Sequence, residues 1–228
     1  MYVAFDIETA GNARKSWVFA VGICATNKNG TIISSQSWSI PPTDYYDVSY
    51  PDSDTSQSAS SEFASIRKYS KFIDPVCYAQ FWHLHQPIMD TLFNAIPPEP
   101  KSAADIWREI SAYIDNLYAT DQKITIIADC PQFDLSFIEN RIESLVPFNT
   151  FISGFGLQYK FIPHLPGRDR LSLYNPYDML HVLPPDERSR VKEDAARRGT
   201  HSHLPAEDAH HMIVLYLAAR KHFQMPPL

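Results

Sequence analysis

The pattern of apolar and polar positions predicts three strands at the start of the chain, followed by a long loop. Residues 2–8, 18–26 and 31–40 are rich in β-branched and aromatic side chains, which is typical of strands. Asn29-Gly30 between the last two indicates a hairpin, so we expect a meander of antiparallel strands. The stretch 41–62, rich in Ser, Asp, Pro and Tyr, predicts a long loop that is mobile over about 43–62.

In the rest of the chain, segments with the apolar spacing of helices alternate with segments typical of strands. Apolar residues recur at helical spacing over 75–95, with a break near Pro87, and over 102–118, where Ser102 fits the N-cap position. The unbroken apolar run 123–129 predicts a parallel strand that is buried on both faces. The remaining elements are a helix over 131–145, irregular structure over 150–178 with a strand near 157–161, a charged stretch over 186–200, and a last helix over 205–223.

This order of elements predicts a single α/β domain over residues 1–228, with helices on both faces of a mixed sheet. A hydrophobic content of 44% and a charged content of 20% are ordinary for a globular protein. No apolar run has the length of a membrane span, and no signal-peptide pattern begins the chain. The three cysteines are scattered, which indicates reduced thiols and no zinc site. We therefore expect a cytoplasmic protein with no membrane partner.

Asp6 and Glu8 are the first residues with candidate chemistry. Side chains alternate along a strand, so both carboxylates face the same way, about 6–7 Å apart along the strand axis. Two carboxylates on a buried strand repel each other and resist desolvation. A hard divalent cation such as Mg²⁺, bound by both, removes that cost. The spacing alone does not separate such a metal site from an acidic strand end that faces solvent.

Two further acids stand at predicted helix starts. Asp134 follows the predicted parallel strand, at the crevice position where open α/β sheets carry functional groups. Asp208 lies in the first turn of the last helix, and either acid alone also fits the helix dipole. Their combination with the N-terminal pair is rare. The chain reads Asp-x-Glu, then Phe-Asp at a strand-to-helix turn, then His203 five residues before Asp208.

This combination resembles the DEDD exonuclease superfamily, which has a ribonuclease-H-like fold. The spacing of His203 to Asp208 resembles its DEDDh branch, whereas the sister branch has a tyrosine where this chain has Leu204. Trp82 and Gln86 further resemble a Trp-x-x-x-Gln stretch of a subgroup of small phage and bacterial 3′–5′ exonucleases and exoribonucleases. For the physical role of this pair we favour a core tryptophan and a surface glutamine on a helix.

The second motif departs from the family pattern at one position. Many DEDDh members carry an asparagine four residues before the second-motif acid, and this chain has Cys130 there. Neighbouring Asp129 either takes the polar role or caps the helix.

The resemblance implies a two-metal-ion 3′–5′ exonuclease that hydrolyses phosphodiester bonds and releases nucleoside 5′-monophosphates. It implies that Asp6, Glu8 and Asp208 hold one Mg²⁺ or Mn²⁺ ion. Asp6 would bridge this ion to a second one, which Asp134 holds. His203 would be the general base, because imidazole titrates near neutral pH.

Other histidines compete with His203 for the role of base. His201, His210 and His211 lie close by in sequence, but only His203 has the five-residue offset to Asp208. His201 and His203 could also be misread as a zinc pair, although no cysteine lies near them.

Substrate contacts are predicted from residues that flank the motifs. Gly11 would allow close approach of a substrate backbone, and Trp17 and Phe133 would stack on terminal bases. The cationic run 188–198, which includes Arg197 and Arg198, would contact phosphates; a solvated charged loop explains it equally well.

The partner predicted by this interpretation is single-stranded or 3′-terminal RNA or DNA, with a lean towards RNA. The net charge of −6 counts against a simple electrostatic binder of nucleic acid. Two alternatives stay open: a nucleic-acid-binding module of the same fold without catalysis, and a hydrolase of very short oligonucleotides. The sequence does not fix the oligomeric state, and a homodimer is one option.

Overall fold

The computed structural model describes most of the chain, and its residues form two compact units. The described residues are 1–12, 16–42, 62–120, 124–129, 133–134, 137, 147–153, 156–161, 172–199 and 201–224. The first unit consists of Met1–Asp6, Gly22–Ser37 and Glu109–Leu228, and the second of Ile7–Val21 and Trp38–Arg108. The predicted loop 43–62, most of the predicted helix 131–145, and Cys130 lie outside the described residues.

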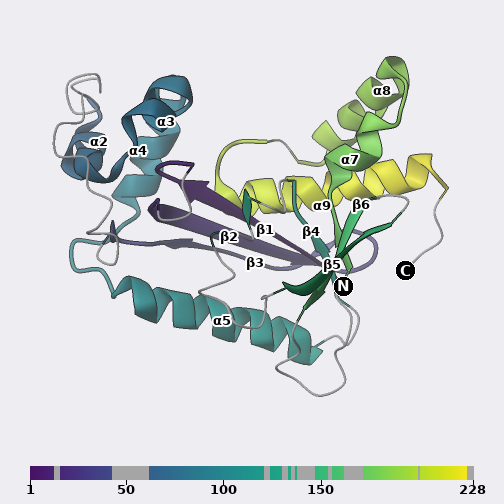
Figure 1. The fold of residues 1–228 in the computed structure, drawn as a ribbon, viewed down its shortest axis with the longest axis horizontal. Helices are drawn as coiled ribbons and strands as arrows, with labels where there is room; N and C mark the ends of the chain where they lie inside the picture. The colour runs from purple at the N-terminus through teal and green to yellow at the C-terminus, as the bar shows by residue number, and fades with distance from the viewer. Residues whose placement is uncertain are drawn as a thin grey trace. The chain divides into compact units, whose positions relative to one another are not determined.

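The first unit is built on a mixed sheet, so the predicted α/β class is confirmed. Its strand order is β3-β2-β1-β4-β7. Figure 1 labels the first four of these strands. β1 pairs with β4 and β4 with β7 in parallel. The connections from β1 to β2 and from β2 to β3 are too short for a parallel crossover, so these neighbours are antiparallel. The strands span Tyr2–Thr9 (β1), Val18–Thr26 (β2), Ile32–Ser39 (β3), Thr125–Ile127 (β4) and Ser172–Tyr174 (β7).

The burial of each strand follows its composition. β1, β2 and β4 are buried along their whole length, as their largely apolar composition predicts, and in β1 this burial includes Asp6 and Glu8. β3 carries serine and glutamine, and most of its residues are at least partly exposed at the edge of the sheet. The predicted strands 2–8, 18–26, 31–40 and 123–129 are therefore all confirmed.

Helix α9 (Pro205–His222) packs directly on the sheet of the first unit. Met212, Ile213 and Tyr216 from this helix share a core with Ala4 of β1 and Ile127 of β4. The approach of the helix to β2 is very close at one point. A Cβ atom on Gly22 would lie 2.1 Å from the carbonyl carbon of Pro205, so only glycine fits there. The predicted last helix is confirmed, and its first turn is fixed against β2.

The region after β4 contains more regular structure than the sequence predicts. The strand predicted near 157–161 is confirmed as β6 (Gly156–Phe161), which pairs antiparallel with β5 (Pro147–Ser153). The expectation of otherwise irregular structure over 150–178 is wrong where the chain is described. β5, β7 and the start of α7 (Pro176–His181) occupy it.

The charged stretch 186–200 is also mostly a helix rather than a loop. α8 (Pro185–Ala196) buries only Val191 and Ala195, which lie four residues apart on one stripe. This narrow stripe packs against α9, where Nε2 of His222 lies 3.0 Å from Oε2 of Glu187. A helix with so few apolar positions leaves a weak periodic signal, which explains why the sequence analysis predicted no helix for this charged stretch.

The second unit is a group of short helices around an aromatic core. Trp17 stacks on Phe93 and contacts the rings of Tyr69 and Phe72. The predicted helix 75–95 is interrupted before Pro87 rather than at it, because proline is well tolerated in the first turn of a helix. The elements are α2 (Ala64–Tyr69), η3 (Ser70–Phe72), α3 (Pro75–Gln80), η4 (Trp82–His85) and α4 (Gln86–Asn94).

Helix α5 (Ala103–Thr120) belongs partly to each unit. Its predicted N-cap is confirmed, since the backbone N–H of Asp105 donates to Oγ of Ser102 over 3.1 Å. Over the described part of the chain, no helix combines the length and apolar character that crossing a membrane requires.

Candidate functional site

Asp208 is the centre of the candidate site in the first unit. It lies in the first turn of α9, and only 1% of its side chain is exposed. Its Oδ1 accepts a hydrogen bond from the backbone N–H of Ser202 (2.6 Å), and its Oδ2 from that of His203 (2.9 Å). These hydrogen bonds and the helix dipole stabilise the carboxylate in its buried position.

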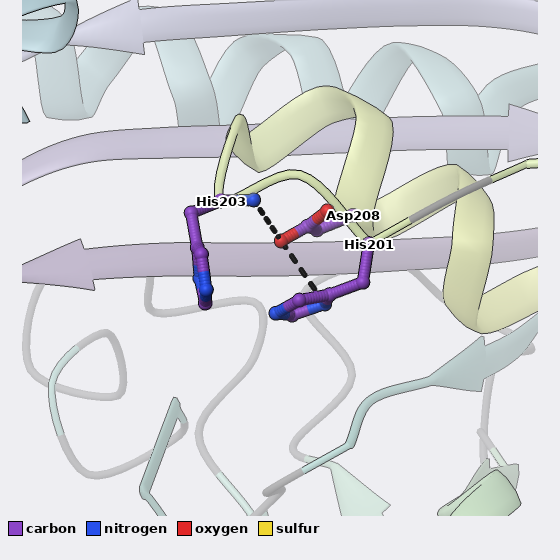
Figure 2. Close-up of side chains that lie close together, drawn as sticks. All are labelled: His201, His203 and Asp208. Carbon is purple, nitrogen blue, oxygen red and sulfur yellow. Dashed lines mark hydrogen bonds and ion pairs between the residues drawn. The ribbon is translucent and has the colours of Figure 1, made fainter. Parts of the chain in front are cut away.

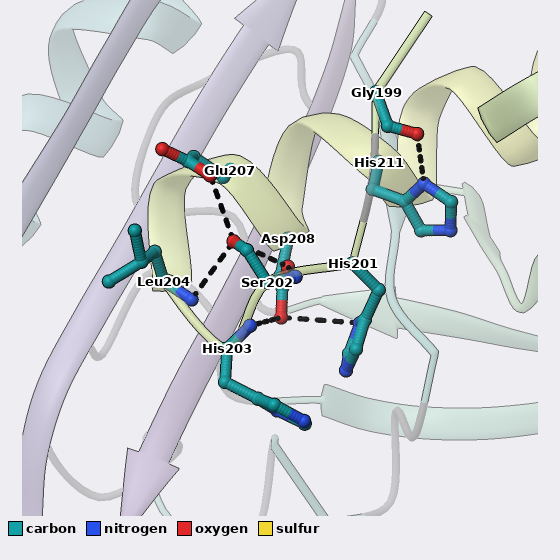
Figure 3. Close-up of polar contacts among 8 residues, drawn as sticks. All are labelled: Gly199, His201, Ser202, His203, Leu204, Glu207, Asp208 and His211. Atoms are coloured by element: carbon teal, nitrogen blue, oxygen red, sulfur yellow. Dashed lines mark hydrogen bonds and ion pairs between the residues drawn. The ribbon is translucent and has the colours of Figure 1, made fainter. Parts of the chain in front are cut away.

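The loop before α9 has the conformation that these contacts need. His203 adopts a positive φ of 58°, which is uncommon for a residue other than glycine. Residues in this conformation can turn successive N–H groups towards one anion. Ser202 reinforces the turn, because its hydroxyl donates to Glu207 (2.9 Å) and accepts from the N–H of Leu204 (3.3 Å) (Figure 3). The loop is therefore tied to the first turn of the helix through Glu207 and holds Asp208 at the same time.

Two histidine rings lie beside this carboxylate. Nδ1 of His201 is 3.2 Å from Oδ2 of Asp208. The rings of His201 and His203 meet edge to face with centroids 4.4 Å apart (Figure 2). Each of the three residues offers one ligand atom within 4.8 Å of the others. His203 was preferred over His201 as the base because of its spacing to Asp208. The structure shows that the ring of His201 contacts Asp208, while His203 donates to it through its backbone N–H.

Asp6 is the second acid that the first unit brings to this place. Ligand oxygens of Asp6 and Asp208 lie within 4.8 Å of each other, although 202 residues separate them in sequence. Asp6 is only 9% exposed. Glu8 is buried too and follows two residues later on the same strand, so its side chain leaves β1 on the same face. Buried carboxylates at this distance repel each other unless a cation or a proton neutralises them.

Asp134 stands apart from these close groups. Its side chain is buried and lies in the described helical part of the stretch after β4. Among the described residues, the groups whose ligand atoms converge within 4.8 Å do not include Asp134. The metal role of Asp134 stays a prediction. The role of Cys130 is untested, because that residue lies outside the described part of the chain.

Tyr177 is a residue near the site that the sequence analysis missed. Burial, followed by the negative charges of Asp129 and Asp208, raises the pKa of its phenol. Tyr177 lies in the first turn of α7, which Asn175 caps by accepting its N–H (2.8 Å). Asn175-Pro176 is a helix-start signal that could have placed this tyrosine beside the carboxyl end of a strand.

The structure contradicts the prediction that Trp17 stacks on a terminal base of the substrate. Its side chain is fully buried, and its Nε1 donates to the carbonyl of Ile40 over 2.8 Å. Trp17 thus packs in the aromatic core of the second unit and has no face for a base. Gly11 has an internal reason to be glycine, because a Cβ there would lie 2.7 Å from Oγ of Ser16 and 2.9 Å from Cβ of Asp74.

The other three predicted contacts remain predictions. Phe133 is half-buried, and its ring packs against Phe137 with centroids 4.8 Å apart. Arg197 and Arg198 are exposed just after the end of α8, where Arg198 lies 3.7 Å from a carboxylate oxygen of Asp194. These arginines are available to solvent, and their weak ion pairing leaves them able to contact an anion.

The Trp-x-x-x-Gln stretch has a structural role in the second unit. Nε1 of Trp82 donates to the carbonyl of Thr9 over 2.9 Å, directly after Glu8 in the chain. Nε2 of Gln86 donates to the hydroxyl of Tyr78 over 2.6 Å. Trp82 therefore fixes the end of β1, and Gln86 is buried rather than exposed.

Comparisons with known proteins do not identify the chain. No protein-family model matches it, and no curated protein is similar to it. Its function is therefore argued from the geometry and chemistry of the site.

Proposed function

We propose that this protein is a two-metal-ion 3′–5′ exonuclease that acts on RNA or single-stranded nucleic acid. One observation carries the proposal: Asp6 of β1 and Asp208 of α9 form a buried pair of carboxylates with two histidine rings beside it. The mixed sheet, with a parallel part around β1 and β4, supports the ribonuclease-H-like architecture that goes with this function.

The donor atoms fit Mg²⁺ or Mn²⁺. Asp6, Glu8 and Asp208 offer only carboxylate oxygens, which hard divalent cations prefer. In the proposal these three hold one ion, and Asp134 contributes to a second. When bound, such ions stabilise the charge that develops on the phosphoryl group and lower the pKa of the attacking water.

The chain's own residues then have distinct tasks. The backbone N–H groups of Ser202 and His203 hold the Asp208 carboxylate in one orientation. His203 accepts the proton of the attacking water. The phenol of Tyr177 stays protonated, because burial and the nearby Asp129 and Asp208 raise its pKa, so it can donate a hydrogen bond to a phosphate oxygen.

His201 is the second candidate for the proton acceptor. Its Nδ1 lies 3.2 Å from Asp208, and a histidine oriented by a carboxylate is a common general base. The assignment to His203 rests on its offset from Asp208, so the two single variants decide between them.

The proposal is tested with oligomers of RNA and DNA labelled at the 3′ or the 5′ end, incubated with Mg²⁺, Mn²⁺ or EDTA. We expect 3′-labelled substrate to release labelled mononucleotide first, and EDTA to stop the reaction. A bulky group on the 3′-hydroxyl should also stop it. Efficient cleavage of circular single strands, or turnover in EDTA, would overturn the proposal. Turnover restricted to dimers and trimers would instead favour a hydrolase of very short oligonucleotides.

A further inference from the structure

The cluster at the start of α9 contains a donor set that the proposed Mg²⁺ chemistry does not need. His201 and His203 bring imidazole nitrogens to within 4.8 Å of a carboxylate oxygen of Asp208. Both rings extend to the same side of that carboxylate (Figure 2). We propose that these three residues form a binding site for a borderline-soft transition-metal ion, of which Zn²⁺ is the type.

The observed distances are close to those of such a site. Zn²⁺ lies about 2.0–2.2 Å from nitrogen and carboxylate ligands, so two ligands of a tetrahedral ion are about 3.4 Å apart. Nδ1 of His201 and Oδ2 of Asp208 are separated by 3.2 Å. The ring of His203 contacts that of His201, and its ligand nitrogen lies within 4.8 Å of the other two ligand atoms, so His203 is placed to supply the third protein ligand. A water molecule would fill the fourth position.

The hydrogen bonds around the ligands show that their positions are fixed by the fold and are not a chance contact. Asp208 is fully buried and cannot move away, since backbone N–H groups bind both of its oxygens. Oδ1 accepts from the N–H and, over 3.4 Å, from the hydroxyl of Ser202, whereas Oδ2, the oxygen beside His201, keeps a second lone pair for a metal. Such outer hydrogen bonds orient the ligands of natural metal centres in the same way.

The type of donor separates this site from the carboxylate site. Mg²⁺ prefers oxygen ligands and rarely binds imidazole, whereas Zn²⁺ and Co²⁺ bind imidazole well. The scattered cysteines argued against zinc, but that argument concerned thiolate ligands only. The histidines and Asp208 need no cysteine.

Asp208 and His203 belong both to the zinc-type site and to the residues proposed for hydrolysis. Binding of Zn²⁺ should therefore inhibit the hydrolysis. This inhibition rests on the proposed function, whereas the binding of the metal does not. A bound Zn²⁺ ion would occupy the lone pair of His203 that accepts the proton. It would also compete for Asp208. The chain would then hydrolyse substrate with Mg²⁺ or Mn²⁺ and stop when micromolar Zn²⁺ is present.

The test is a titration of the metal-free, full-length chain with Co²⁺, followed by its visible absorption spectrum, and competition by Zn²⁺. We expect one ion per chain, with bands typical of nitrogen ligation. His201→Ala and His203→Ala should each weaken binding by about 10²-fold or more, because even an outer partner of a metal ligand costs 10–100-fold. His181→Ala is the matched control, since this exposed histidine ends α7 and should leave binding unchanged.

Asp6→Asn separates this proposal from the proposed nuclease. It should abolish Mg²⁺-dependent hydrolysis and keep the Co²⁺ spectrum. Loss of the Co²⁺ site in Asp6→Asn, absence of binding in the wild-type chain, or equal binding in wild type and His201→Ala would each overturn the zinc-type site. His201 is 40% exposed, so His201→Ala should fold, and circular dichroism checks this.

Discussion

A charged residue is buried at each end of α9, and the side chains around the two charges differ. Asp208 in the first turn and Arg220 in the last both agree with the helix dipole. Arg220 donates to the hydroxyl of Tyr2, and its guanidinium lies 5.6 Å from the ring centroid of Tyr216. Burial raises the pKa of Tyr216, so this neighbour stays neutral. Asp208, by contrast, lies within 4.8 Å of another carboxylate, that of Asp6.

The difference shows how a stabilising charge can be told from a functional one. A charge that only holds the fold can be stabilised by dipoles and rings of the protein itself, as the Tyr2 hydroxyl and the Tyr216 ring do beside Arg220. The Asp208 end keeps two acids and two histidines together, an arrangement that costs stability until a ligand arrives. Helix position and burial alone would not separate the two residues.

Removal of Asp6 should have the largest effect on activity. We expect Asp6→Ala to lower hydrolysis with Mg²⁺ by about 10³-fold or more, since ligands of catalytic ions contribute several kcal/mol to transition-state stabilisation. The free energy of unfolding, measured with urea, should stay the same or rise, because a like charge beside Asp208 is gone. Asp178→Ala, an exposed acid on α7, is the control. Wild-type activity in Asp6→Ala would remove the carboxylate pair from the mechanism.

Replacement of His203 should come next. His203→Ala is expected to lower kcat by about 10²–10⁴-fold, the usual contribution of a general base. Affinity for Mg²⁺ should change little, since the carboxylates bind that ion. His181→Ala serves as the control for a lost histidine. A larger loss of kcat in His201→Ala than in His203→Ala would move the role of base to His201.

Replacement of Arg220 should lower the stability of the protein and leave its activity unchanged. Arg220→Met is expected to lower the free energy of unfolding by about 2–3 kcal/mol, because a buried charge-assisted hydrogen bond to Tyr2 is lost. kcat at a temperature where the variant is folded should not change. Lys221→Met tests an exposed cation one residue further along the helix. If Arg220→Met proved inactive while fully folded, the distinction between the two ends of α9 would fail.

Ser202 should have the smallest effect. Ser202→Ala removes the hydroxyl contacts with Glu207 and Leu204 and the long contact with Asp208, so we expect a loss of about 1 kcal/mol of unfolding free energy, typical of a lost hydrogen bond. The N–H of residue 202 still donates to Asp208, and kcat/KM should fall less than about tenfold. Urea unfolding and steady-state kinetics measure the two quantities. A drop as large as that of His203→Ala would show that the hydroxyl itself positions the acid.

The sequence predicts those helices and strands in which the apolar side chains follow a clear pattern along the chain. β1, β2 and β4 are largely apolar, β-branched and aromatic runs, and α9 carries Met212 and Tyr216 on a buried face. α8 was missed because its few buried residues give too weak a period. The strands β5 and β7 were missed because the residues around them show no clear alternation, and pairing with a distant partner fixes a strand more than its own sequence does.

The site was predicted less completely than the fold. Asp6 and Asp208 were expected to meet, since motif order placed one on the first strand and the other on the last helix. The contact of His201 with Asp208 could not be predicted, because the positive φ of His203 sets the direction of the loop side chains. Trp17 was assigned to the substrate by its closeness in sequence to the first motif, yet packing directs it into the core.

The pairing of Asp6 with Asp208 also determines when the acidic cluster can exist during synthesis of the protein. The two residues are 202 positions apart, since 208 minus 6 is 202, and the second lies on the helix that completes the core of the first unit. At a translation rate of about 5–20 residues per second, roughly 10–40 s pass between their appearances. A nascent chain therefore spends this time without the acidic cluster, and any activity that depends on the cluster can begin only after the last helix has emerged.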